Sequence, residues 1–244
     1  MNHSIIEGSN SLQIKQKKNQ WIITTPEISE QVHVDWFKQE YWLNQGRLLG
    51  ANSGRGTAWT VKSEWGKWVL RHYLRGGLYA KINRDSYFWS GLQKTRAAKE
   101  FELLNKLQQL NLPSPKPIAA LIVKHGLFYK NDLIMENIQH EQTFAQALVD
   151  TTDNEIWQNV GQTIAQFHAN GIYHSDLNAH NILLRQNKVY LIDFDKGEQR
   201  RINAKWPHSN MTRLKRSIEK VTKKSCDHAL KIQWQELLGA YNDK

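Results

Sequence analysis

Hydrophobic residues recur at helical spacing in several parts of the chain, and these parts are the expected helices. Residues 96–109 and 152–169 have the clearest pattern, with apolar side chains three and four positions apart on one face. Gly171 follows the second stretch and is placed to end that helix in a left-handed conformation. Shorter helices are predicted at 36–45 and 143–148.

Apolar runs of strand length lie between these helices. Residues 65–73 read as a strand of a hairpin, and residues 21–24 as a strand near the N-terminus. The run at 132–138 is the expected hinge between two lobes, although Leu133 and Ile134 could equally be ordinary core. Further strands are predicted at 120–124, 127–129, 182–184 and 189–192.

The order of these elements predicts the fold class. A strand-rich half precedes a helix-rich half, which is typical of an α+β protein with its site in the cleft between the two parts. At 244 residues the chain has room for one two-lobed domain with a substantial core. We therefore expect a single domain over 1–244.

One polar segment contains carboxylate and amide side chains at a spacing that suggests catalysis. Asp176 and Asn181 lie on the predicted loop after the second long helix, and Asp193 follows twelve residues after Asn181. Phosphoryl transfer to a hydroxyl needs a carboxylate that accepts the proton and oxygen ligands for metal ions on the phosphates. At the spacing of a kinase catalytic loop, Asp176 is the expected base, and Asn181 and Asp193 are the expected metal ligands. The alternative is a polar loop that matches by chance.

Two positions in this segment differ from the kinase pattern. Ser175 replaces the arginine that holds a phosphorylated activation loop, so control by that route is not expected. Asp195 replaces a glycine and could bind metal, hold the loop by hydrogen bonds or face water. Only fifteen residues separate Asp195 from the helix expected at Met211, too few for the peptide-docking segment of protein kinases. The segment therefore favours a small acceptor.

A glycine-rich stretch precedes the strand at 65–73. Gly54 and Gly56 would let backbone N–H groups approach phosphate oxygens closely, as in a nucleotide-binding loop. The same Gly-x-Gly spacing is common in simple hairpin turns. The kinase-like segment later in the chain favours the phosphate-binding interpretation.

A cation is also expected against the phosphates. Arg71 stands where kinases place a strand lysine, with Lys81 and Arg75 as alternatives. Glu100, early on the helix at 96–109, is the expected partner of Arg71, and Glu102 is the competitor. Both charges could instead be ordinary surface residues.

Composition limits the class of protein. No stretch approaches the roughly 18 apolar residues of a membrane span, and residues 1–11 lack a signal-peptide core. Cys226 is the single cysteine, which excludes an intrachain disulfide. We expect the protein to stay in a cytoplasmic, ATP-containing compartment.

The net charge of +10 is concentrated late in the chain, where residues 196–244 carry twelve Lys or Arg and five Asp or Glu. An apolar helical stripe there should pack on the core, with basic residues on the opposite side. That basic side could meet anionic lipid, nucleic acid or only water. The stripe is Met211, Leu214, Ile218 and Val221, and the basic residues are Arg213, Arg216, Lys220, Lys223 and Lys224.

With these segments in view, the chain resembles the lipopolysaccharide-core kinases that phosphorylate 3-deoxy-D-manno-octulosonic acid (Kdo). The resemblance covers roughly residues 36–220, and its most specific parts are residues 176–181 and 193–197. It implies a protein-kinase-like fold, with a strand-rich N-lobe and N-terminal extension over 1–137 and a helical C-lobe over 138–244. Looser matches lie in 54–59, 70–77, Lys81, Phe101 and 113–117.

The resemblance also implies an activity and a location. It implies transfer of phosphate from ATP, with Mg²⁺, to the 4-hydroxyl of a Kdo residue on the lipid A precursor, in lipopolysaccharide inner-core biosynthesis. It places a peripheral protein on the anionic cytoplasmic face of the inner membrane of a Gram-negative bacterium. No nucleic acid and no obligate protein partner are expected. Candidate acceptor contacts are Lys196, Arg200, Arg201 and Arg213.

Two other function classes fit parts of the sequence. An atypical protein kinase acting on a protein or ribonucleoprotein could also be basic and lack the peptide-docking segment. A nucleotide-binding protein without catalysis would be expected to have lost Asp176 or Asp193, and both are present.

Overall fold

The computed structural model describes residues 3–5, 12–51, 58–74, 85–150, 153–203, 205–223 and 228–243. The chain forms two compact units, one of Met1–Asn105 with Lys116–Asn137 and one of Lys106–Pro115 with Ile138–Lys244. The chain enters the second unit at Lys106, returns to the first at Lys116, and enters the second again after Asn137. Residues 106–115, which the lobe division above puts in the first half, group with the second unit. Within the described ranges, no helix is long and apolar enough to cross a membrane.

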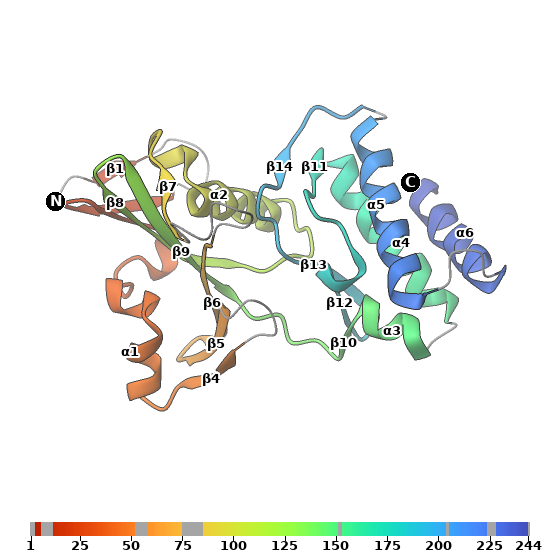
Figure 1. The fold of residues 1–244 in the computed structure, drawn as a ribbon, viewed down its shortest axis with the longest axis horizontal. Coiled ribbons are helices and arrows are strands. Elements are labelled where there is room, and N and C mark those ends of the chain that lie inside the picture. The colour runs from red at the N-terminus through yellow and green to blue at the C-terminus, as the bar shows by residue number, and fades with distance from the viewer. Residues whose placement is uncertain are drawn as a thin grey trace. The chain divides into compact units, whose positions relative to one another are not determined.

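The first unit is built on an antiparallel sheet (Figure 1). In the described part of the unit the strand order is β1-β2-β3-β8-β9-β6-β5-β4, and β7 pairs with β9 off this path. The strands are β1 His3–Ile5, β2 Gln13–Lys17, β3 Gln20–Thr24, β4 Leu48–Ala51, β5 Ala58–Ser63, β6 Gly66–His72, β7 Tyr87–Phe88, β8 Pro117–His125 and β9 Phe128–Glu136.

The N-terminal residues extend this sheet. The strand predicted at 21–24 is present as β3, and it forms a hairpin with β2 that the sequence analysis did not predict. β3 also pairs with β8, where Trp21 lies opposite Ile122 and Ile23 opposite Ala120. Because Ile23 is 2% exposed and Ala120 is 0% exposed, this part of the extension belongs to the core of the unit.

The helix predicted at 36–45 is divided into two short segments. These are a 3₁₀ helix, η2 (Val34–Phe37), and α1 (Gln39–Asn44), and Lys38 between them is extended. Trp36 and Trp42 are both buried, and their ring centroids lie 5.3 Å and 6.1 Å from that of Trp68. On a continuous helix, residues six apart point to different sides, so the break lets both rings reach the core. The cluster also includes residues of the 3₁₀ helix η1 (Pro26–Ile28).

The helix predicted at 96–109 is present as α2 (Arg96–Gln109), preceded by the 3₁₀ helix η4 (Leu92–Lys94). Side chains of β9 bind its first N–H groups: the Ala97 N–H donates to Asn131 Oδ1 at 2.8 Å, and the Arg96 N–H donates to the Tyr129 hydroxyl at 3.1 Å. These contacts satisfy donors that a helix start leaves open.

The predicted hinge at 132–138 is wrong for most of its length. β9 continues through Glu136, and Leu133 and Ile134 are 0% exposed within the sheet. The alternation of apolar residues there is the inward face of a strand, so both side chains are core residues.

The second unit is mainly helical in its described residues, with two small antiparallel sheets. The sheets follow the orders β10-β12-β13 and β11-β14. The helices are α3 Phe144–Asp150, α4 Asn154–Ala169, η5 Ala179–Asn181, α5 Lys205–Thr222 and α6 His228–Asn242. The strands are β10 Gln142–Thr143, β11 Ile172–Tyr173, β12 Ile182–Arg185, β13 Lys188–Leu191 and β14 Glu198–Gln199.

Helix α6, which the sequence analysis did not predict, packs closely on α4 (Figure 1). A Cβ added at Gly161 would lie 2.2 Å from the Leu237 carbonyl oxygen, so only glycine permits this approach. Gln158 Nε2 also donates to Glu236 Oε2 at 2.8 Å. α6 is therefore an integral part of the second unit.

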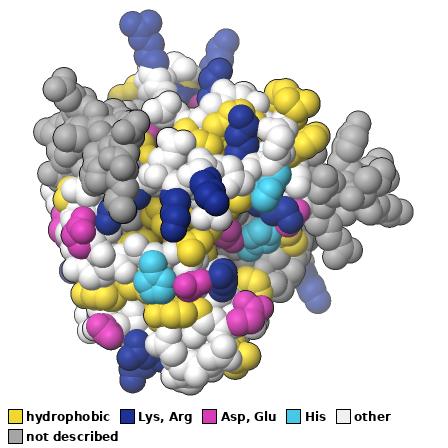
Figure 2. All heavy atoms as spheres, turned by 90° about the vertical axis from the view of Figure 1, so that its left-hand side faces the viewer, with side chains coloured by type: hydrophobic (Ala, Val, Ile, Leu, Met, Phe, Trp, Pro, Cys, Tyr) yellow, Lys and Arg dark blue, Asp and Glu magenta, His cyan; other side chains and the backbone are white. Residues whose placement is uncertain are grey.

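The amphipathic helix predicted near 211–221 is longer than expected. α5 begins at Lys205, and Asn203 Oδ1 accepts a hydrogen bond from the Lys205 N–H at 2.9 Å. Leu214 and Ile218 are buried as predicted, and Arg216, Lys220 and Lys223 are exposed. Figure 2 shows a different face, on which basic, acidic and apolar side chains are interspersed over the described residues.

Candidate active site

The loop that carries Asp176 follows β11, and a tight turn at Gly171 connects α4 to that strand. Gly171 has φ +73°, as its predicted position after α4 requires, and a Cβ there would lie 2.5 Å from the Arg200 carbonyl oxygen. The Arg200 N–H donates to the Gly171 carbonyl at 2.7 Å, beside the pairing of β11 with β14. The loop then ends in η5, where Asn178 Oδ1 accepts from the N–H groups of His180 and Asn181.

His174 ties this loop to the chain that leads into Asp193. Its Nδ1 accepts from the Asp176 N–H at 3.1 Å, so its Nε2 carries the proton and donates to the Ile192 carbonyl at 2.9 Å. The ring is 2% exposed, and burial lowers the pKa of His174 below its ordinary value. A neutral histidine therefore holds the loop by both ring nitrogens.

Asp176 presents its carboxylate to solvent, with the side chain 57% exposed. Asn178 Nδ2 donates to Asp176 Oδ2 at 3.1 Å and to the Asp176 carbonyl at 3.0 Å. Asn181 Nδ2 also donates to that carbonyl at 3.0 Å, which leaves Asn181 Oδ1 as the oxygen able to bind a cation. The structure thus brings the predicted base and one predicted metal ligand together.

Asp193, the other predicted metal ligand, has φ +64° and a buried Oδ1. A left-handed backbone is uncommon for a residue other than glycine and marks strain of the kind found at functional sites. Phe194 fixes the turn, because it is 0% exposed and stacks on Phe167 with ring centroids 5.7 Å apart. The Gly197 N–H closes the turn on the Phe194 carbonyl at 2.7 Å.

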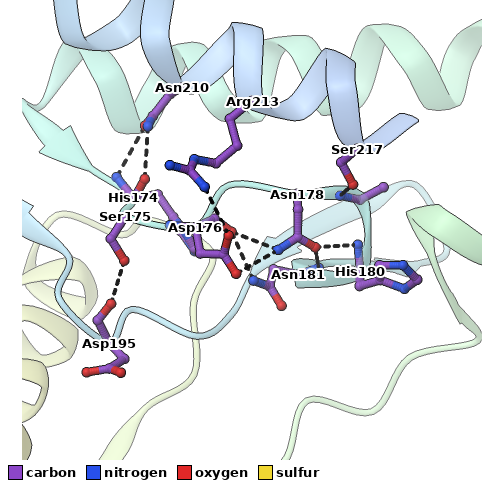
Figure 3. A network of polar contacts seen from close by, with 11 residues as sticks. His174, Ser175, Asp176, Asn178, His180, Asn181, Asp195, Asn210, Arg213 and Ser217 are labelled. Atoms are coloured by element: carbon purple, nitrogen blue, oxygen red, sulfur yellow. Dashed lines mark hydrogen bonds and ion pairs between the residues drawn. The ribbon is translucent and has the colours of Figure 1, made fainter. Parts of the chain in front are cut away.

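Ser175 and Asp195, the two departures from the kinase pattern, contact each other. Ser175 Oγ donates to the Asp195 carbonyl at 2.5 Å (Figure 3). The serine that replaces an arginine therefore joins the two halves of the candidate site by a hydrogen bond to the backbone.

Helix α5 supports the loop from one side through three residues on one face (Figure 3). Asn210 Nδ2 donates to the His174 carbonyl at 2.9 Å, and its Oδ1 accepts from the His174 N–H at 3.3 Å. Ser217 Oγ accepts from the Ala179 N–H at 3.1 Å. Arg213 lies between them with Nη1 3.5 Å from Asp176 Oδ1. Its predicted place opposite the apolar stripe is wrong, because it belongs to the face against the loop.

Behind Asn210 the polar contacts continue to α4 and α6. His168 Nε2 donates to Asn210 Oδ1 at 3.3 Å, and the Tyr241 hydroxyl donates to His168 Nδ1 at 2.8 Å. Burial lowers the pKa of His168 to about 4, so the ring is neutral near pH 7. The sequence analysis missed Asn210, His168 and Tyr241. An asparagine four positions before Leu214, on the same helical face, was the available signal.

In the first unit, Arg71 contacts Glu100, the partner predicted for it. Arg71 Nη1 lies 3.2 Å from Glu100 Oε1, and the Tyr73 hydroxyl donates to Glu100 Oε2 at 2.5 Å. Glu100 is 2% exposed, and burial of the Tyr73 hydroxyl, together with the charge of Glu100, raises the pKa of Tyr73 well above its ordinary value. Glu102, two positions along α2, points to another side of the helix and is half-buried. Tyr73 was not predicted, since a tyrosine in a strand carries no signal of its partner.

Three other predicted nucleotide contacts, Gly54, Gly56 and Lys81, lie outside the described residues, as does the alternative Arg75. Within the described ranges, no group of three or more His, Cys, Asp or Glu side chains could hold a metal ion. Asn181 and Asp193 match instead the way Mg²⁺ binds with substrate phosphates, through one or two protein oxygens.

The cations predicted as acceptor contacts differ in their surroundings. Arg200 is engaged by Glu198, with Nε 2.7 Å from Oε1, and its guanidinium lies 3.5 Å from the centre of the Tyr173 ring. Lys196 and Arg201 are exposed. Arg213 lies beside Asp176, with Nη1 3.5 Å from Oδ1.

The chain is similar in sequence to several proteins named as kinases. The chain is 38% identical over 239 residues to a 3-deoxy-D-manno-octulosonic acid kinase of Haemophilus influenzae (strain PittEE), covering 93% of this chain and 98% of that protein. It is 43% identical over 183 residues to the kinase of that name from Vibrio cholerae, covering 74% and 77% of the two chains.

Two solved structures share the fold. WaaP in complex with acyl carrier protein has a TM-score of 0.53 and 13% identity, covering 88% of this chain and 86% of that one. An amicoumacin kinase in complex with AMP-PNP, Ca²⁺ and Ami has a TM-score of 0.57 and 10% identity, covering 88% and 79%. Both are kinase-like folds, which bears out the predicted fold class.

A family model described as the lipopolysaccharide kinase (Kdo/WaaP) family matches residues 39–241, a range that includes Asp176, Asn181 and Asp193. With that match and the relatives above, the chain is a kinase and belongs to the lipopolysaccharide kinase (Kdo/WaaP) family.

Proposed function

We propose that this protein transfers phosphate from ATP to the 4-hydroxyl of a Kdo residue on the lipid A precursor, in lipopolysaccharide inner-core biosynthesis. One observation carries the choice of acceptor: relatives named as Kdo kinases match 93% of the chain at 38% identity. The loop around Asp176 supports the choice of reaction, because it presents a carboxylate at the spacing that phosphoryl transfer to a hydroxyl uses.

In the proposed reaction the 4-hydroxyl oxygen attacks the terminal phosphorus, the bond to the β-phosphate oxygen breaks, and ADP leaves. Asp176 accepts the hydroxyl proton. Its carboxylate suits this role because it is 57% exposed and yet held, with Asn178 Nδ2 3.1 Å from Oδ2. His174 and Asn210 keep the backbone of the loop in place, so the base does not have to be ordered during the reaction.

A divalent cation such as Mg²⁺ would neutralise charge on the phosphates when bound. Asn181 and Asp193 fit as its protein ligands, because Asn181 directs Nδ2 to the Asp176 carbonyl and keeps Oδ1 for a cation. Arg71 would contact the phosphates while Glu100 fixes its guanidinium. Gly54, Gly56 and Lys81 remain the other proposed nucleotide contacts.

The connection after Asp195 supports a small acceptor over a protein. Since α5 begins at Lys205, the segment between them is residues 196–204, shorter than the fifteen residues expected from the sequence. A segment of this length is too short to form the peptide-docking region of a conventional protein kinase.

We also propose that the protein acts peripherally at the cytoplasmic face of the inner membrane. The support is the exposed basic side of α5, where Arg216, Lys220 and Lys223 face solvent. Each such charge near an anionic bilayer contributes about 1 kcal/mol to binding. Flotation with liposomes containing anionic lipid should therefore weaken in the Lys220→Ala/Lys223→Ala variant and in high salt. Flotation that is unaffected by either change would contradict the proposal.

The reaction is tested with radiolabelled ATP and three acceptors: Kdo-bearing lipid A precursor, the same lipid without Kdo, and a mixture of proteins. We expect label only on the Kdo-bearing lipid. A fourth acceptor, in which the Kdo residue lacks its 4-hydroxyl, should receive none. Label on protein alone, or on lipid that lacks Kdo, would contradict the proposed acceptor.

A further inference from the structure

We infer that Arg213 binds the carboxylate of the acceptor sugar beside the catalytic base. The inference rests on the proposed function, because it assigns an acceptor contact within the same reaction. It identifies a residue that determines which hydroxyl compounds are phosphorylated.

The position of Arg213 is the first support. Its side chain extends from α5 toward Asp176, with Nη1 3.5 Å from Asp176 Oδ1 (Figure 3). The two side chains are 50% and 57% exposed. A guanidinium has five N–H donors in a planar fork, so a single long contact to Asp176 leaves donors for a second anion.

The neighbours of Arg213 on α5 fix its place relative to the loop. Asn210 binds both backbone groups of His174, and Ser217 binds the Ala179 N–H. Arg213 lies between these two anchors on the same helical face, three residues after one and four before the other. Its backbone therefore cannot shift without breaking hydrogen bonds on both sides.

The chemistry of the acceptor supplies the second support. In Kdo the carboxylate is on C2, two ring bonds from the C4 that carries the reacting hydroxyl. A hydroxyl placed at Asp176 therefore brings the sugar carboxylate close to the Asp176 carboxylate. Two like charges at short range repel each other, and a cation between them offsets that repulsion. Arginine suits this position because its fork matches a carboxylate by two parallel hydrogen bonds.

The other predicted acceptor cations are less suited to this contact. Arg200 is held by Glu198 and lies over the Tyr173 ring. Among the residues that the structure describes, Arg213 is the predicted acceptor cation that pairs with Asp176. We therefore expect the acceptor carboxylate to be recognised from α5.

The experiment is a cycle with two enzymes and two acceptors. Wild type and Arg213→Ala are assayed with Kdo-bearing lipid A precursor and with the same lipid whose Kdo carboxylate is converted to a carboxamide. For wild type, kcat/KM should fall about 10- to 100-fold with the carboxamide, as expected for a lost charge-assisted bidentate contact. For Arg213→Ala, kcat/KM should be low with both acceptors and should differ by less than about threefold.

Two further variants complete the test. Arg213→Lys keeps the charge without the fork and should recover only part of the preference for the carboxylate. Arg185→Ala removes an exposed arginine from β12 and should keep the wild-type preference. The KM for ATP should change less than twofold in the Arg213 variants, which separates acceptor binding from a role at the phosphates.

The outcomes separate failure of the Arg213 inference from failure of the proposed function. If Arg213→Ala retains the full preference for the carboxylate, the inference is wrong while the proposed function stands. If wild type does not phosphorylate the Kdo-bearing lipid, both fail. If Arg213→Ala shows no thermal unfolding transition and is therefore unfolded, Arg213→Lys takes its place in the test. In that variant, an unchanged preference for the carboxylate over the carboxamide, together with a raised KM for ATP, would also overturn the inference.

Discussion

The loop around Asp176 and the pair Arg71–Glu100 hold charged groups in opposite ways. Asp176 is 57% exposed, and neutral groups of Asn178 and His174 fix its loop by hydrogen bonds. Glu100 is 2% exposed and depends on Arg71 and the Tyr73 hydroxyl. A charge at the surface costs little to keep, whereas a buried charge costs several kcal/mol unless it is paired. The first group should therefore matter for turnover alone, and the second for both stability and nucleotide binding.

The largest expected effect is on turnover at the exposed site. Asp176→Asn should lower kcat by about 10²- to 10⁴-fold, because the amide cannot accept the hydroxyl proton. ATP binding and the urea midpoint should stay close to wild type. The measurements are steady-state kinetics, nucleotide titration and urea unfolding. A large loss of stability would show that the exposed carboxylate is structural and would break the comparison.

The buried pair should respond in the opposite way. Glu100→Ala leaves Arg71 and the Tyr73 hydroxyl without their shared acceptor, and we expect about 3–5 kcal/mol of destabilisation. Urea unfolding measures this loss directly. Tyr73→Phe is the matched variant, since it removes one hydrogen bond and keeps the ion pair, and it should cost about 1–3 kcal/mol. Equal losses in the two variants would mean that Arg71 adds nothing to holding Glu100.

The neutral histidines behind the loop predict a pH dependence of stability. The pKa of His168 falls from 6.5 to about 4 on folding because the ring is buried. The folded state therefore excludes a proton that the unfolded state takes up below pH 6.5. Stability from this group is fully present above pH 6.5 and is lost as the pH falls toward 4, by about 3 kcal/mol in total.

Urea unfolding between pH 7.5 and pH 4.5 measures this loss. His168→Gln cannot bind the proton, so its stability should decline less steeply over that range than that of wild type. The buried His174 shifts in the same direction and should leave part of the slope in the variant. A slope that is unchanged in His168→Gln would exclude a neutral His168 as the source.

The smallest expected effect concerns the support of the loop. Asn210→Ala removes two hydrogen bonds to the His174 backbone, and kcat should fall about 10- to 100-fold with little change in the KM for ATP. Asn210→Asp keeps the shape but cannot donate to the His174 carbonyl. Asn210→Asp should also raise the pKa of His168, so that the loss of stability at acid pH begins at a different pH from that of wild type. An unchanged kcat in both variants would show that the loop holds Asp176 without α5.

The success of sequence-based prediction depended on the range of the interactions. The spacing of apolar residues predicted α2 correctly, and the kinase pattern led to the Arg71–Glu100 contact and to the shared loop of Asp176 and Asn181. These features are encoded over short distances or by a known motif. The hydrogen bond of Tyr73 joins distant elements and leaves no such pattern, and the one signal for Asn210, its place on the helical face of Leu214, was overlooked.

Two elements were misjudged for different reasons. Leu133 and Ile134 were considered for a hinge because a kinase-like arrangement expects one there, but they are the inner face of β9. Helix α6 has Trp234, Leu237 and Ala240 buried at intervals of three, a pattern that could have predicted it. Its contact with α4 depends on Gly161, and a glycine within a helix more often reads as a weak point.

The hydrogen bonds from Tyr241 through His168 and Asn210 to His174 also set an order for folding during synthesis. The ribosome makes the loop around Asp176 well before α5 and α6, yet both helices contribute groups that hold it. The nascent chain therefore carries Asp176, the proposed base, before its loop has its final support. Phosphoryl transfer should therefore reach its full rate only after α6 has left the exit tunnel and packed on α4.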